Sequence, residues 1–203
     1  MKVEMECLFE FQSKLLDSYF LARPVNLFKE DDLKLIRGDF KNIEFPIVFK
    51  QSAGKKMSDV LDTERPWLYL ISGKLKNTLE VNNLTGWKTY PIKLYDKKDN
   101  EIHGYYGFSV AGRSGPIYYD ESKILEEKKV PTGPLVKYFK GRFIDPESWD
   151  GSDFFLPEGT IGITVNGKTA EMLKKEKISN LVLDPLVDQK TRVADVLGKK
   201  TSS

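Results

Sequence analysis

The chain has 203 residues, of which 40% are hydrophobic and 31% charged, so collagen, coiled coil and wholesale disorder are excluded. Its 32 basic and 30 acidic side chains leave a net charge of +2, which gives no overall reason to expect a nucleic-acid partner. No apolar run is long enough to span a membrane, and three glutamates interrupt the amino-terminal segment where a secretory signal needs an apolar stretch. We therefore expect a cytoplasmic protein with no membrane partner.

The first third of the chain gives weak signals of secondary structure. Residues 3–9 alternate loosely and favour a strand, and residues 30–38 favour a short helix that ends at a glycine. Residues 45–49 form a short apolar run typical of a strand. The polar residues 51–64 are interpreted as a connector, with one helical turn near 57–61.

From residue 67 the pattern is clearer. Residues 67–71 are apolar, Ser72 can cap a helix, and the helical spacing after it ends at Gly86. The alternation over residues 87–95 predicts one strand, and residues 103–110 have the aromatic and β-branched content of another.

A second segment repeats this design. When the sequence is shifted by 94 residues, Ser72-Gly73-Lys74 aligns with Asn166-Gly167-Lys168, Leu79 with Leu173, and Pro91 with Pro185. Both segments therefore predict a strand, a capped helix and a strand. We infer an α+β fold with a mixed, mainly antiparallel sheet, a few short helices and two similar strand-helix-strand units.

The predicted organisation has three parts. Residues 45–186 form the main α+β domain, residues 1–44 form an amino-terminal segment packed on it, and residues 187–203 form a carboxy-terminal tail. Within that tail, residues 192–197 favour a short helix, and the polar end after it is expected to fray.

Few residues are suited to catalysis or to metal binding. His103 is the only histidine and Cys7 the only cysteine, which excludes a multi-histidine site and a cysteine cage. Residues 112–115 (Gly-Arg-Ser-Gly) lack one residue of a nucleophile elbow, and residues 107–116 lack the ending of a phosphate-binding loop. We interpret residues 107–116 as a strand that turns tightly at a glycine and reverses into another strand, and we expect no cofactor.

An acidic loop with aromatic residues runs from Asp145 to Glu158. Its spacing does not fit an EF-hand, which would need a glutamate where Pro157 stands. The aromatic side chains either contact a protein partner or anchor the loop to the core. The candidate partner-binding residues are Asp145, Glu147, Trp149, Asp150, Asp153 and Phe154.

Basic and aromatic residues alternate over residues 136–143, as in some proteins that bind single-stranded nucleic acid. As a strand, this segment distributes its basic side chains over both faces and forms no basic stripe. We expect no nucleic-acid partner.

The sequence over residues 105–122 resembles uncharacterised bacterial proteins assigned to the immunity proteins of polymorphic toxin systems. It is most similar to immunity family forty-three and its relative, family eleven. The similar features are the Gly-Phe-Ser-Val core at 107–110, the Trp-Asp-Gly-Ser-Asp-Phe-Phe stretch at 149–155, and the two strand-helix-strand segments. The resemblance covers about residues 45–186, and its pattern residues are Gly112, Arg113, Gly115, Asp120 and Ser122.

This resemblance implies a non-catalytic immunity protein that binds and neutralises a cognate toxin domain encoded nearby. If that toxin is a nuclease with a basic surface, the acidic loop is a natural docking edge. Charge reversal at Asp150 and Asp153 is then expected to slow association without unfolding the protein. The pattern residues have a second interpretation as turn-forming residues of the fold.

Two other classes of function stay open from the residues. A generic scaffold or nucleic-acid module predicts binding that falls steeply with salt. Asp120, Asp150 and Asp153, with Arg113 as an anchor for an anion, are the residue types of a metal- or carboxylate-dependent hydrolase or transferase.

Overall fold

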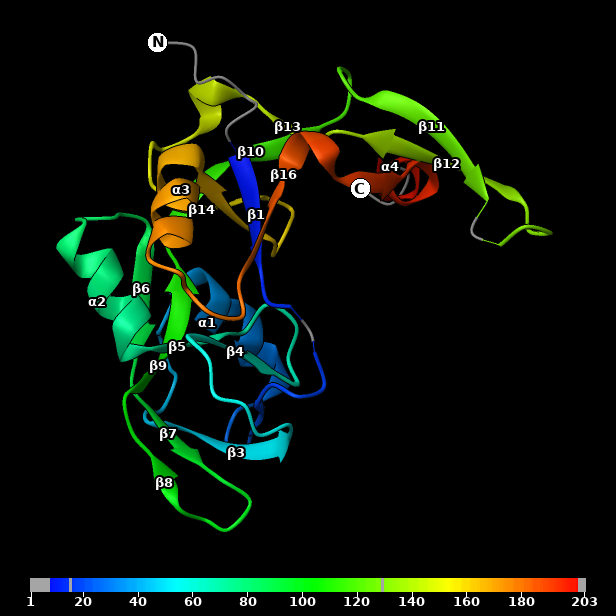
Figure 1. Ribbon diagram of the computed structural model, residues 1–203. Helices are drawn as coiled ribbons and strands as arrows, with labels where there is room; N and C mark the ends of the chain where they lie inside the picture. The colour runs from blue at the N-terminus through cyan, green and yellow to red at the C-terminus, as the bar shows by residue number, and fades with distance from the viewer. Residues whose placement is uncertain (1–7, 15, 129, 201–203) are drawn as a thin grey trace.

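The computed structural model describes residues 8–14, 16–128 and 130–200, and it has an α+β fold of mostly antiparallel sheets (Figure 1). The helices in these residues are α1 (Asp32–Arg37), α2 (Gly73–Val81), α3 (Gly167–Lys175) and α4 (Val193–Lys200), with 3-10 turns at Lys29–Asp31, Pro146–Ser148 and Leu186–Asp188. The strands are β1 (Leu8–Gln12), β2 (Leu21–Pro24), β3 (Ile47–Ala53), β4 (Val60–Thr63), β5 (Leu70–Ser72), β6 (Trp87–Tyr90), β7 (Ile92–Tyr95), β8 (Glu101–Ile102), β9 (Tyr105–Val110), β10 (Gly112–Tyr118), β11 (Lys123–Lys128), β12 (Leu135–Lys140), β13 (Phe143–Ile144), β14 (Phe154–Glu158), β15 (Ile163–Asn166), β16 (Val182–Pro185) and β17 (Lys190–Arg192).

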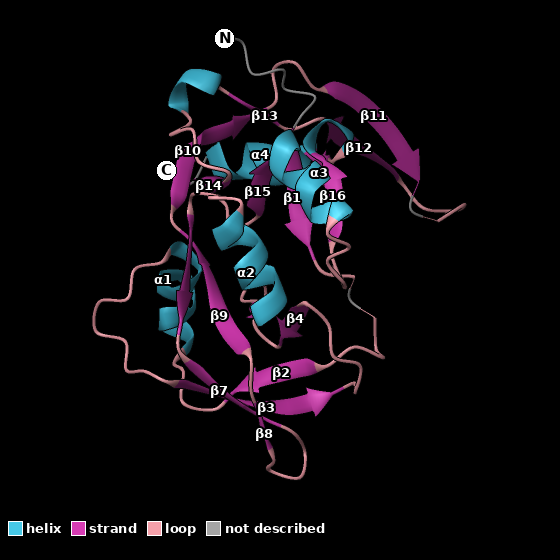
Figure 2. Cartoon of the chain, turned by 60° about the vertical axis from the view of Figure 1, so that its left-hand side comes forward, coloured by secondary structure: helices cyan, strands magenta, loops and turns pink. Residues whose placement is uncertain are grey.

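Three sheets organise these strands. A six-stranded sheet has the order β13-β10-β14-β15-β1-β16, and an eight-stranded sheet has the order β6-β9-β5-β4-β2-β3-β7-β8. They form the upper and lower parts of the body in Figures 1 and 2. The third sheet, β11-β12-β17, belongs to a hairpin that projects from the upper part.

The amino-terminal segment is part of both large sheets. β1 lies between β15 and β16, and β2 lies between β3 and β4. The strand predicted over residues 3–9 begins at Leu8, and its earlier part lies outside the described residues. The helix predicted over residues 30–38 is present as α1, followed by Gly38 in the left-handed conformation.

Three predictions about local structure were wrong. Residues 51–64 contain the end of β3 and the buried strand β4 in place of a connector with a helical turn. Residues 87–95 form two strands, because Pro91 separates β6, which pairs with β9, from β7, which pairs with β3 and β8. Residues 107–116 do not reverse: β9 belongs to the eight-stranded sheet and β10 to the six-stranded sheet.

The two predicted strand-helix-strand units are confirmed in detail. Ser72 accepts a hydrogen bond from the Leu75 amide at 3.1 Å, and Asn166 accepts one from the Thr169 amide at 2.9 Å. α2 and α3 both have nine residues and start and end at positions 94 apart. The capping side chains were identifiable from sequence because an N-cap acts on amides two or three residues away.

The repeat extends further than the sequence indicated, because the same shift of 94 residues also relates one more strand in each unit, β4 in the first and β14 in the second. Val60 pairs with Ile71 in β4 and β5, and Phe154 pairs with Val165 in β14 and β15. A completing strand then lies between the strand before each helix and the strand after it: β9 in one case and β1 in the other. We name β4-β5-α2-β6-β9 the first unit and β14-β15-α3-β16-β1 the second unit.

The completing strands also occupy equivalent registers. Gly107 of β9 lies opposite Leu70 and Tyr90, and Glu10 of β1 lies opposite Thr164 and Asp184, which are 94 residues further on. The completing strand of the first unit therefore follows its last strand in sequence, whereas that of the second unit comes from the amino terminus.

Reciprocal hydrogen bonds join the two units. The Asp59 carboxylate accepts from the amide and hydroxyl of Ser179, at 2.8 and 2.7 Å. The Asp153 carboxylate accepts from the amide and hydroxyl of Thr85, at 2.8 and 3.0 Å. These positions are 94 residues apart in each case, so equivalent residues exchange equivalent bonds, as across a two-fold axis. The molecule thus has internal pseudo-two-fold symmetry.

The main core lies where the units meet. Phe11 of β1 and Phe108 of β9 occupy equivalent positions, are almost completely buried, and have ring centroids 5.9 Å apart. Phe154 packs against both rings. A smaller core forms on the second unit around Leu8, Phe155 and other residues, namely Ile144 and Leu186.

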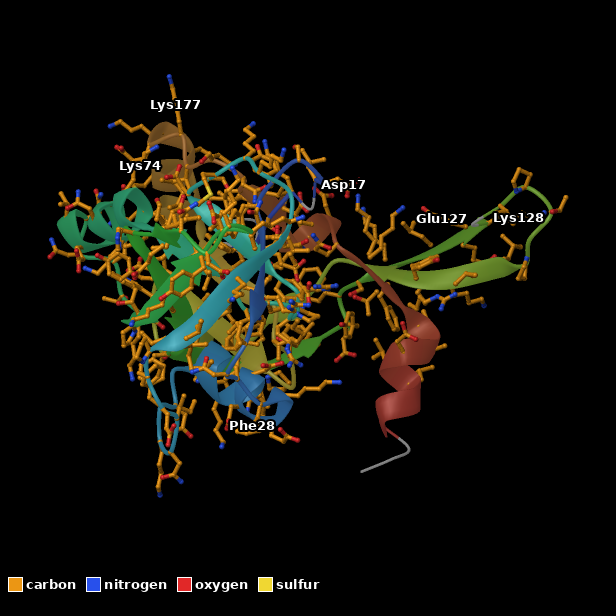
Figure 3. All side chains as sticks on the ribbon, turned by 90° about the horizontal axis from the view of Figure 1, so that it is seen from below. Asp17, Phe28, Lys74, Glu127, Lys128 and Lys177 are labelled. Atoms are coloured by element: carbon orange, nitrogen blue, oxygen red, sulfur yellow. The ribbon has the colours of Figure 1, made fainter. Side chains whose placement is uncertain are left out.

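The arm, residues 123–128, 130–140 and 190–200, consists of β11, β12, β17 and α4. α4 packs against β12 and β17, which confirms the predicted helix near residues 192–197. Tyr119 stacks on Phe139 at 5.1 Å where the arm joins the body. Figure 3 shows the arm reaching away from the body, with Glu127 and Lys128 in its outer part.

Candidate functional surfaces and cavity

The acidic loop wraps around the start of β10. The Arg113 amide donates to the Asp150 carboxylate at 2.7 Å, and Ser152 donates to the same carboxylate. Burial alone would raise the pKa of Asp150, but these hydrogen bonds and the Arg113 charge outweigh it and lower the pKa. Asp150 therefore serves to close the loop against the strand.

Gly112 and Gly115 are required by close approach of the loop. A Cβ on Gly112 would lie 2.0 Å from the Ser152 hydroxyl oxygen and 2.2 Å from the Phe154 carbonyl oxygen. A Cβ on Gly115 would lie 2.7 Å from the Ser148 hydroxyl oxygen. Neither glycine is in the left-handed region, so the prediction that they form turns was wrong. They are needed because the loop packs directly against their Cα atoms.

Asp153 lies between the two units. Its carboxylate accepts from Thr85 and also from Asn166 and Thr169, at 2.9 and 3.3 Å. Burial raises its pKa, and the hydrogen bonds from these three residues more than compensate and lower it. Charge reversal here would break the contact between the units, so the expectation that reversal at Asp150 and Asp153 leaves the fold intact is not supported by these contacts.

The aromatic side chains of the loop anchor it to the core. Phe154 is fully buried, so its side chain is inaccessible to a partner. Trp149 packs on Phe155 at 5.2 Å and donates from Nε1 to the Ser152 carbonyl at 3.1 Å. Asp145 and Glu147 remain exposed on a 3-10 turn, and together with the exposed Asp150 they are the part of the predicted docking set that can present charge.

The remaining pattern residues lie at the other end of β10. Ser122 donates to the Gly141 carbonyl at 2.7 Å, and Asp120 is exposed in the turn before the arm. Asp120 follows Arg113 by seven positions, most of them in the extended strand β10, which places the two residues roughly 20 Å apart. Asp120 is thus remote from Asp150 and Asp153. Within the described residues no three His, Cys, Asp or Glu side chains gather to hold a metal ion.

The arm combines apolar and basic side chains on a projecting surface. Four of the ten exposed large hydrophobic side chains in the described residues belong to it: Ile124, Val130, Leu135 and Leu197. Over residues 123–128, 130–140 and 190–197 it has six basic and three acidic side chains, a net charge of +3 in a chain whose total is +2. β11 is also an edge strand, whose outer side has no strand partner in the described residues. The arm is the candidate docking surface.

A cavity of about 500 Å³ lies at the root of the arm, on the outer face of the second unit. Glu10 is 5% exposed on its wall, and Arg142 Nη1 lies 3.0 Å from Glu10 Oε1. Gln12 donates to the other carboxylate oxygen of Glu10. Arg142 also donates from Nε to the Thr191 hydroxyl at 3.1 Å. Sequence reasoning missed this site because Glu10 and Arg142 are 132 residues apart.

No known family model and no curated protein matches the chain. The resemblance to immunity families stays a prediction from the residues. In the described part of the chain, no helix has the length and apolar character needed to cross a membrane.

Proposed function

We propose that the chain is an immunity protein that binds and neutralises a toxin domain encoded nearby, and that the arm is its docking element. The observation that carries the proposal is the exposure of aliphatic side chains on a projecting, basic hairpin. Ile124 is 61% and Leu135 59% exposed, and both lie on one face of the β11-β12 ladder. Exposed apolar groups that gather on one projecting element are typical of protein interaction sites.

The positive charge of the arm indicates the charge of the partner surface. Ion pairs within the structure occupy two of its three acidic residues, since Glu126 pairs with Lys137 and Glu127 with Lys190. The remaining basic side chains can steer an acidic partner surface toward the arm. The toxin surface that it contacts is therefore acidic. This differs from a basic toxin docking on the acidic loop, where Asp150 is bound to the start of β10 and Asp153 joins the two units.

The arm fits a protein better than a nucleic acid. Single-stranded nucleic acids bind to exposed aromatic side chains, on which their bases stack. Tyr138 and Phe139 are only partly exposed, and Phe139 is stacked on Tyr119. The exposed groups of the arm are aliphatic, and these contribute to affinity when a protein surface covers them.

A rescue experiment tests the function. The chain is co-expressed in a bacterium with the carboxy-terminal domain of the large protein encoded beside it, and survival and co-purification are measured. Survival with a stoichiometric complex is expected. Death without a complex, when the domain is toxic and both proteins are well expressed, would show that this function is wrong.

Two double variants test the arm. We expect Ile124→Ser with Leu135→Ser to weaken toxin binding at least tenfold, because a protein interface depends on a few buried apolar anchors. The matched control is Phe28→Ser with Val81→Ser, at 76% and 70% exposure; Phe28 lies on the body (Figure 3) and Val81 ends α2. If the arm variant binds the toxin as tightly as the wild type and still rescues the cell, the arm is not the docking element, although the immunity function would stand. Binding to single-stranded DNA that weakens steeply with salt, without rescue, would support the nucleic-acid alternative.

A further inference from the structure

The two units differ on their outer faces. In the first unit, the Tyr90 ring covers Gly107 so closely that a Cβ there would lie 2.0 Å from the ring. Phe40 and Phe45 pack on Tyr90, each at 5.8 Å. The outer face of the first unit is therefore filled with aromatic rings.

At the equivalent positions the second unit has polar residues and a cavity. Glu10 replaces Gly107, Asp184 replaces Tyr90, and Thr164 replaces Leu70. A buried ion pair such as Glu10 with Arg142 contributes little net stability, because desolvation of both charges offsets their attraction. The same fold with an apolar face shows that stability does not require these polar groups. Their presence points to a ligand.

Polar groups on the cavity wall are available to that ligand. Thr164 is 2% exposed, lines the cavity, and makes no side-chain hydrogen bond with any other described residue. The Glu10 carboxylate accepts hydrogen bonds from Arg142 and Gln12 and has lone pairs left to accept more. The inner part of the cavity therefore offers hydrogen-bond acceptors.

Positive charge lies at the rim. Arg37 lines the cavity and also an adjoining hollow of about 300 Å³, which Arg113 and Glu158 line as well. Arg113 Nη2 donates to the Arg37 carbonyl at 2.8 Å, and burial together with the Arg37 charge lowers the pKa of Arg113. The Arg37 guanidinium has no ion pair or hydrogen bond with the described residues. The lining of this hollow carries two arginines and one glutamate, and because Asp150 offsets part of the Arg113 charge, Arg37 is the main attraction for an anion.

We propose that the cavity binds a small organic anion. Its phosphate or carboxylate group lies at Arg37 and Arg113, and N–H or O–H groups at its other end donate to Glu10 and Thr164. The volume is within the usual range for small-molecule sites, about 300 to 1,000 Å³. This site is separate from the exposed apolar surface of the arm, and its test needs no toxin.

The experiment is a thermal-unfolding panel on the purified full chain with AMP, GMP, glucosamine phosphate, glutamate and inorganic phosphate. At one hundred times its dissociation constant, a bound organic anion should raise the melting temperature by roughly 5 to 10 °C. No shift from any organic anion would overturn the proposal, as would an equal shift from inorganic phosphate, which lacks the donor end. The organic anion that gives the shift is then titrated by calorimetry.

Matched variants locate the binding. Arg37→Gln should weaken binding about tenfold or more, because it removes a charge-assisted hydrogen bond at the exposed rim. Thr164→Val keeps the side-chain shape, removes the hydroxyl, and should weaken binding severalfold. Arg23→Gln, at an exposed arginine on β2, is the control and should bind like the wild type. Unchanged affinity in both cavity variants would place the ligand elsewhere and overturn the proposal.

Discussion

Asp153 illustrates how one partly buried carboxylate can hold two halves of a molecule together. It accepts hydrogen bonds from Thr85 in the first unit and from Asn166 and Thr169 in the second. We expect Asp153→Asn to lower the free energy of unfolding by about 2 to 3 kcal/mol, because it removes charge-assisted bonds and places an NH₂ group opposite donors. Urea unfolding measures the change, and Asp17→Asn, at an exposed position, is the control. A loss no larger than the control's would contradict this role.

The same carboxylates predict a dependence of stability on pH. Hydrogen bonds hold the pKa of Asp59 and of Asp153 below the ordinary value of 3.8, despite the opposing effect of burial. The folded state therefore binds these protons less tightly than the unfolded state, and the stabilisation is present above about pH 4 and lost as pH falls through the lower folded pKa. The difference in unfolding free energy between wild type and Asp153→Asn should shrink below about pH 4. A constant difference down to about pH 2 would contradict the assignment.

Gly112 gives a steric prediction at the residue scale. A Cβ would meet the Phe154 carbonyl oxygen at 2.2 Å, and a backbone atom cannot move aside cheaply. We expect Gly112→Ala to destabilise the protein by more than about 2 kcal/mol. Gly73→Ala is the matched control: its nearest contact would be 3.5 Å away, and alanine favours a helix start over glycine. Similar melting temperatures for the two variants would show that the loop can move.

Local signals explain what the sequence revealed about single residues. The caps Ser72 and Asn166 were predictable because each acts on an amide three positions along its own helix. The role of Asp153 was not predictable, because Thr85 lies 68 residues away and an acidic loop is usually solvated. Gly112 was interpreted as a turn glycine because its steric partner, the acidic loop, follows 40 residues later.

At the scale of elements, α2 and α3 should contribute equally to stability. Leu79 and Leu173 are equivalent, fully buried and face the same core. We expect Leu79→Ala and Leu173→Ala each to cost about 2 to 5 kcal/mol, the usual range for a buried leucine. Val81→Ala, at 70% exposure at the end of α2, is the control and should cost well under 1 kcal/mol. If only one of the two leucine variants lowered the free energy of unfolding, the two helices would not contribute equally to stability despite their equivalent positions.

Elements with regular periodicity were predicted, and those held by distant partners were not. The helices follow from apolar spacing and caps within about ten residues. β4 was missed because Asp59, just before it, and Asp62, within it, make the local sequence polar, although the structure buries both beside β5 and the second unit. The reversal predicted after β9 failed because Gly112 serves close packing in another sheet, which the local sequence does not encode.

At the scale of the whole molecule, the shift of 94 residues was visible but its meaning was not. The completing strands β9 and β1 stand at different places along the chain, so no alignment of consecutive segments relates them. The cavity depends on the same arrangement, since β1 brings Glu10 to Arg142 across 132 residues. The candidate ligand site therefore needed the assembled fold to be found.

The interlocked topology predicts that the chain can be cut at the arm without losing its fold. A break between Pro131 and Thr132 leaves β1 and β10 on one fragment, whereas their partners β14, β15 and β16 are on the other. We expect fragments 1–131 and 132–203, co-expressed, to co-purify in equal amounts and unfold in one transition, because neither can complete the second unit alone. Removing residues 1–13 from the first fragment should abolish the complex, since β15 and β16 then lose the strand between them. A fragment 132–203 that folds as a monomer on its own would refute this interdependence.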